Sequence, residues 1–87
     1  MYAVIKLAVE EAIKNSETIV YTFDNLSSAK QCWEEETKLM EEDVSNFPGS
    51  QFHKNPELFE ATFEYEDFAT KVQLVELKPH GLVVVNF

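Results

Sequence analysis

The sequence predicts an α+β fold, in which an antiparallel sheet of about five strands is covered on one face by one main helix. Three observations lead to this prediction. Residues Asp24–Asp43 carry apolar side chains at helical spacing, with no Gly or Pro inside the stretch. Residues before and after this stretch alternate apolar and polar side chains, as strands do. The chain has 87 residues, a length that suits one domain over residues 1–87 with one hydrophobic core.

The N-terminal residues are predicted to form a β-hairpin. Residues Tyr2–Glu10 alternate in the manner of a strand, and Thr18–Phe23 is a β-prone run that needs a neighbouring strand. Residues 14–17 would make the connecting turn. A short helix over residues 3–14 is the alternative, because the same apolar side chains also fit a helical stripe. We favour the hairpin.

The predicted helix Asp24–Asp43 has one apolar face and many acidic side chains. Asn25 is the expected N-cap, and Glu36 and Thr37 are expected to form a polar gap in the apolar face. Three acids crowd the C-terminal end of the helix, where carbonyl groups already concentrate negative charge. The side chains predicted to face the core are Leu26, Ala29, Cys32, Trp33, Leu39 and Met40.

The second half of the chain is predicted to hold a loop and three strands. Residues Val44–Glu57 contain two prolines and a glycine, which favours a long loop. Leu58–Asp67 alternates clearly, so its glutamates are expected on the face away from the core. Lys71–Lys78 and Leu82–Phe87 are the remaining strands, joined by a Pro-His-Gly turn. The predicted order of elements is therefore ββαβββ.

Composition narrows the classes of function. The net charge is −9 and the seven basic side chains are all lysines, which disfavours direct binding to nucleic acid or to an anionic membrane surface. The chain has no apolar run long enough to cross a bilayer, and its first residues do not resemble a secretory signal. The single cysteine, Cys32, is expected to be a buried thiol, so we predict a cytoplasmic protein.

Motifs for catalysis, cofactors and metals are missing from the sequence. It has two glycines, no P-loop and no nucleophile motif, and its two histidines, His53 and His80, lack partner residues. The acids at 41–43 do not have the spacing of a calcium loop. We therefore predict no catalytic residue, no cofactor and no metal, and favour a non-enzymatic function.

The acidic side chains are the remaining functional signal. We hypothesise that they bind or inhibit a basic protein, with a nucleic-acid-binding protein as one version of this partner. One alternative is a small enzyme or ligand-binding subunit with a site near residues 45–56 and His53. Another is a structural domain that forms a homodimer through Leu82–Phe87 at a sheet edge. The predicted partner-binding residues are Glu34, Glu35, Glu41, Glu42, Asp43, Glu60, Glu64 and Glu66.

Overall fold

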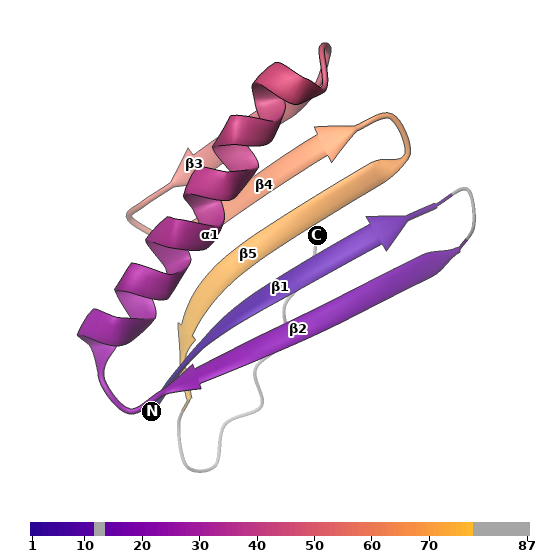
Figure 1. Ribbon diagram of the computed structural model, residues 1–87. Coiled ribbons are helices and arrows are strands. Elements are labelled where there is room, and N and C mark those ends of the chain that lie inside the picture. The colour runs from indigo at the N-terminus through magenta and orange to yellow at the C-terminus, as the bar shows by residue number, and fades with distance from the viewer. Residues whose placement is uncertain (12–13, 78–87) are drawn as a thin grey trace.

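The structure is a computed structural model that describes residues 1–11 and 14–77. Five antiparallel strands form one sheet in the order β2-β1-β5-β4-β3, and one helix lies between β2 and β3 in the chain (Figure 1). This arrangement confirms the predicted α+β fold. The elements are β1 (Tyr2–Glu10), β2 (Asn15–Phe23), α1 (Leu26–Asn46), β3 (Gln51–Asn55), β4 (Glu60–Tyr65) and β5 (Phe68–Glu76).

The N-terminal hairpin is confirmed. β1 and β2 pair without interruption from Tyr2 opposite Phe23 to Glu10 opposite Asn15, so the alternative helix over residues 3–14 is wrong for the described residues. β2 begins earlier than predicted, at Asn15. β1 also pairs with β5, which places it near the centre of the sheet and leaves β2 at an edge.

The predicted long loop over Val44–Glu57 is wrong. Helix α1 continues to Asn46, and Gln51–Asn55 forms strand β3, which pairs with β4. Gly49, at φ 93, makes the turn between them in a conformation that favours glycine. β3 carries a single apolar side chain, Phe52, opposite Phe63, so it shows little alternation in the sequence. The predicted strand Leu82–Phe87 lies outside the described residues.

Helix α1 begins as predicted but buries a different set of side chains. The Asn25 side chain accepts a hydrogen bond from the Ser28 backbone N–H at 2.8 Å, which caps the first turn. Leu39, predicted to face the core, is 58% exposed. Thr37, predicted as part of a polar gap, is fully buried. Its hydroxyl donates to the Glu34 carbonyl oxygen at 3.1 Å, so the helix itself satisfies this buried polar group.

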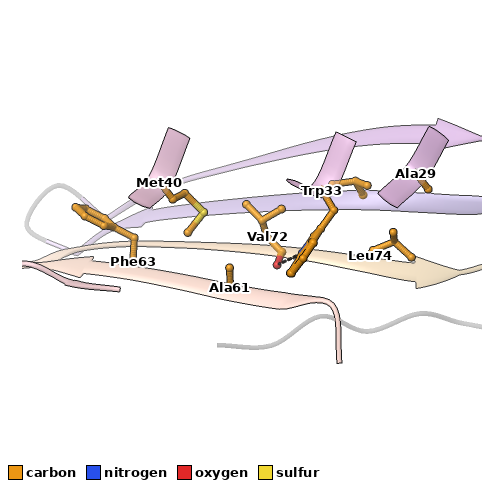
Figure 2. Close-up of a cluster of buried hydrophobic side chains, with 8 residues drawn as sticks. Ala29, Trp33, Met40, Ala61, Phe63, Val72 and Leu74 are labelled. Atoms are coloured by element: carbon orange, nitrogen blue, oxygen red, sulfur yellow. Dashed lines mark hydrogen bonds between the residues drawn. The ribbon is translucent and has the colours of Figure 1, made fainter. Parts of the chain in front are cut away.

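The core lies between α1 and one face of the sheet. Trp33 is fully buried, and its Nε1–H donates to the Val72 carbonyl oxygen of β5 at 3.4 Å (Figure 2). Ala29 and Met40 extend this contact along the helix, and Phe63 and Leu74 of the sheet belong to the same core cluster (Figure 2). The helix follows β2 in the chain and precedes β3, and these two strands form opposite edges of the sheet. The helix therefore crosses the sheet, and it contacts all five strands.

The other face of the sheet carries the alternate side chains of each strand. Since Ala61 and Phe63 of β4 face the helix, the pleat places Glu60 and Glu64 on the opposite face. The predicted acidic face of this strand is therefore confirmed for these two glutamates. Glu66, predicted as part of the same strand, instead lies in the turn between β4 and β5.

Candidate functional site

The predicted partner-binding acids separate into two groups in the structure. We call the first group the helix acids and the second the sheet acids. Most members of both groups are exposed, whereas Asp43 and Glu60 are half-buried. The helix acids are Glu34, Glu35, Glu41, Glu42 and Asp43, and the sheet acids are Glu60, Glu64 and Glu66.

The helix acids lie beside lysines of the same chain. Lys54 of β3 places its Nζ 2.9 Å from a carboxylate oxygen of Glu34 and 5.1 Å from the centre of the Trp33 ring. A shallow hollow of about 370 Å³ is lined by Glu34, Glu35 and Glu41 together with Lys38 and Lys54. Part of the negative charge on this surface is therefore already balanced within the protein.

The C-terminal end of α1 is acidic, and its last turn has no basic side chain to balance the negative charge. Glu41, Glu42 and Asp43 lie in its last two turns, and the last turn carries no basic residue. The carbonyl groups at a helix end repel nearby carboxylates, and each such contact costs a few tenths of a kcal/mol up to about 1 kcal/mol. The Phe47 backbone N–H donates to the Asp43 carbonyl oxygen at 3.0 Å and closes the helix.

Glu60 takes part in the sheet itself. Its carboxylate accepts a hydrogen bond of 2.8 Å from the side-chain amide of Gln73, which lies directly opposite on β5. This cross-strand contact is partly buried. The structure therefore gives Glu60 a role in strand pairing, and it does not group Glu60 with the exposed turn glutamate Glu66.

A second hollow lies at the end of the sheet where β1 ends and the β4–β5 turn begins. Figure 1 shows these two parts of the chain near each other. We call it the sheet-end hollow; its volume is about 380 Å³. Two of the sheet acids line it, and two further acids that sequence analysis missed join them. Apolar side chains complete the lining. The lining residues are Val9, Glu11, Glu64, Glu66, Asp67, Phe68 and Ala69.

Backbone pairing brings these acids together. The Glu11 N–H donates to the Asp67 carbonyl oxygen at 3.1 Å, which joins the end of β1 to the β4–β5 turn. β1 and β5 are neighbours along their whole length, with Glu10 opposite Phe68. Glu11 and Asp67 are far apart in the sequence and belong to no alternating pattern, so only the β1–β5 pairing shows that they meet.

The turn that holds Glu66 is strained. Glu66 and Asp67 connect Tyr65 to Phe68, which lie opposite each other in the β4–β5 hairpin. Glu66 has φ 53, in the left-handed region where a residue with a side chain costs roughly 1–2 kcal/mol. The chain keeps a glutamate here, where glycine would fit at lower cost, and this places a carboxylate at the rim of the hollow.

The sheet-end hollow differs from the helix surface in its counter-charges. No lysine is among its lining residues, and Glu11, Glu64 and Glu66 make no ion pair within residues 1–11 and 14–77. The lining combines carboxylates with Val9, Phe68 and Ala69. This combination suits the side chain of lysine or arginine, whose apolar stem packs on carbon while its charged end meets carboxylates.

The remaining chemical groups do not form a reactive site. Burial raises the pKa of the Cys32 thiol, and Glu36 and Glu35 raise it further, so the reactive thiolate is disfavoured. His53 lies exposed on β3 beside a hollow of about 140 Å³, whereas small-molecule sites span about 300–1,000 Å³. No group of three or more His, Cys, Asp or Glu among the described residues could hold a metal ion.

No protein-family model matches the chain, and comparisons with curated proteins and with solved structures found no match. Within the described residues, no helix is both long enough and apolar enough to cross a membrane.

Proposed function

We propose that this protein is a non-enzymatic, cytoplasmic interaction module that binds a basic protein through the sheet-end hollow. One observation carries the proposal. Glu11, Glu64 and Glu66 converge there on an apolar lining, and none of them is paired with a cation in the part of the chain that the structure describes. A lysine or arginine of the partner would supply the missing positive charge.

The recognition chemistry follows from the lining. The stem of the partner's basic side chain would pack against Val9 and Ala69, while its ammonium or guanidinium group would meet the surrounding carboxylates. Each exposed charge pair contributes only about 0.2–1 kcal/mol, so several carboxylates acting together are needed for useful affinity. The net charge of −9 would also speed the encounter with a basic protein.

The helix acids would act mainly at long range. Lys54 and Lys38 lie among Glu34, Glu35 and Glu41, so a partner's cation would compete there with lysines of the same chain. We therefore assign direct contact to the sheet-end hollow and attraction to the helix surface. A partner that normally binds nucleic acid would fit this division, because its basic surface carries many closely spaced cations.

The test compares two variants that lose the same number of charges. One carries Glu11→Gln, Glu64→Gln and Glu66→Gln, and the other carries Glu34→Gln, Glu35→Gln and Glu41→Gln. Binding to a fluorescent lysine- and arginine-rich peptide is measured by anisotropy at low and moderate salt. We expect the sheet-end variant to lose about tenfold or more in affinity and the helix variant about threefold or less.

The outcomes separate recognition from general charge. Equal losses in both variants would mean that the peptide responds to net charge alone and would contradict a site at the sheet end. A larger loss in the helix variant would move the contact surface to α1. Capture of proteins from a lysate by the wild type, with the sheet-end variant as the matched control, then identifies the natural partner.

A further inference from the structure

Among the residues that the structure describes, strand β2 is an unprotected edge of the sheet. It spans Asn15–Phe23, and every residue except Phe23 is exposed. Natural sheets usually protect an edge with lysine, proline, a bulge or a short strand. β2 contains no lysine or proline, pairs with β1 without interruption, and carries one charged side chain, Glu17. Three large apolar side chains are exposed on it, at Ile19, Val20 and Tyr21.

The opposite edge of the described sheet is protected. β3 has only five residues, Gln51–Asn55, and includes Lys54. Pro48 and Pro56 flank it on both sides, and a proline cannot donate a ladder hydrogen bond. The ion pair between Lys54 and Glu34 also ties β3 to the helix. The two edges of one sheet therefore differ in length, composition and access.

We propose that β2 pairs in antiparallel fashion with β2 of a second copy of this chain, about a twofold axis that passes through Ile19. In this register Ile19 lies opposite Ile19 of the second copy, and Thr18 lies opposite Val20. All residues of β2 then take part in the new ladder. Pairs of β-branched side chains at opposed positions stabilise antiparallel strands.

Charge complementarity selects this register. Glu17 lies opposite Tyr21 of the second copy, so the one charged residue of the strand does not meet its own copy. Just beyond the two ends of the strand, Lys14 comes opposite Asp24 of the second copy, and the symmetry repeats this pair at the other end. Both residues are exposed, so each can turn toward its partner. A register that opposed Glu17 to Glu17 would instead be disfavoured.

The dimer is compatible with the fold on the helix side. Opposed residues of an antiparallel pair point to the same face of a sheet, so the two helices would lie on one face of a single continuous sheet. Residues Ile19 and Tyr21 lie on that face, because they are opposite Lys6 and Val4 of β1, which face the helix. The proposal does not depend on the sheet-end hollow or its partner.

The first experiment measures mass by sedimentation velocity across a wide concentration range. We expect a monomer–dimer equilibrium for the wild type. Ile19→Lys would place two lysines opposite each other at the axis and should weaken the dimer about tenfold or more. His53→Lys, an exposed change on the other edge strand, is the matched control and should leave the equilibrium unchanged.

The second experiment tests the register by charge exchange. Lys14→Asp and Asp24→Lys should each weaken the dimer, because each places like charges opposite one another. The double variant restores opposite charges and should recover the wild-type equilibrium.

Two results would overturn the proposal. The first is a monomer at every concentration, which would mean that this edge does not join two copies. The second is a dimer that responds to His53→Lys and not to Ile19→Lys. A dimer weakened by Ile19→Lys, but without recovery in the charge-exchange variant, would overturn the register through Ile19.

Discussion

The two acidic surfaces of this protein carry similar residues but differ in what surrounds them. On α1, Glu34 meets Lys54 at 2.9 Å, and Lys38 lines the same hollow. At the sheet end, Glu11, Glu64 and Glu66 meet no cation among the described residues. The comparison teaches that the number of exposed carboxylates does not by itself mark a binding surface. The presence or absence of a counter-charge within the fold distinguishes the two.

Removing the counter-charge from the helix surface should make the two surfaces more alike. Lys54→Met keeps a long apolar stem but removes the ion pair with Glu34 and the contact with the Trp33 ring. We expect about 1 kcal/mol of lost stability by urea unfolding, because a surface ion pair contributes up to about that amount and a cation–π contact contributes a similar amount. The helix surface should also gain affinity for a basic peptide.

That gain is best measured in the variant whose sheet-end carboxylates are already glutamines. Binding that returns when Lys54→Met is added would show that the internal lysine suppresses the helix surface. Lys30→Met is the control, since Lys30 lies 5.4 Å from the Phe59 ring and forms no ion pair among the described residues. Binding that stays absent with Lys54→Met would contradict the explanation by counter-charge.

The strained turn at Glu66 offers a second way to sharpen the comparison. Glu66→Gly should raise stability by about 0.5–1 kcal/mol, because glycine adopts φ 53 without a steric cost. The same change removes a carboxylate and should weaken peptide binding. Glu66→Gln separates the two effects, since it keeps the strain and loses the charge. Chemical denaturation and anisotropy together test both, and a Gly variant that is less stable would contradict the assigned strain.

Cys32 senses the negative charge of Glu36 and of the helix acid Glu35, and we expect the resulting pH dependence to be the smallest of these effects. Its pKa is raised above 9.0 by burial first, and then by Glu36 and Glu35. A thiol with a raised folded pKa ionises more readily in the unfolded chain, so stability should fall as pH rises above about 9. Cys32→Ser should remove that part of the pH dependence.

Alkylation rates of Cys32 measured against pH provide a direct comparison of the two surfaces. Glu35→Gln should shift the alkylation profile toward lower pH, whereas Glu64→Gln on the sheet should leave it unchanged. An equal shift from both variants would mean that the thiol senses the net charge of the protein and not the nearby helix acids.

Periodicity in the sequence was sufficient for much of the fold. The alternation in β1 and β4 and the helical spacing of Ala29, Trp33 and Met40 each indicated the correct element. Periodicity was insufficient where a structural feature involves a single side chain and no repeat. β3 carries one apolar side chain, Phe52, and Thr37 enters the core because its hydroxyl is satisfied within the helix. Neither event leaves a repeated pattern.

The candidate site was only half visible in the sequence. Glu64 and Glu66 belong to an alternating acidic run, so they were predicted. Glu11 and Asp67 reach the hollow because β1 lies beside β5, and the sequence contains no local signal for that pairing. Lys54, which balances Glu34, was equally hidden, because it approaches the helix from strand β3. The sequence shows which residues are acidic or basic, but it does not show which of them become neighbours through the pairing of β1 with β5.

The central pairing of β1 with β5 also has a consequence for how the protein is made. The β1–β2 hairpin and α1 leave the ribosome before β5 does. β1 can pair with its second neighbour only after β5 has been synthesised. Until then β1 exposes a free edge, and contacts between distant parts of a chain form more slowly than local ones. The sheet-end hollow, closed by the hydrogen bond from Glu11 to Asp67, therefore forms later than the β1–β2 hairpin in a new chain.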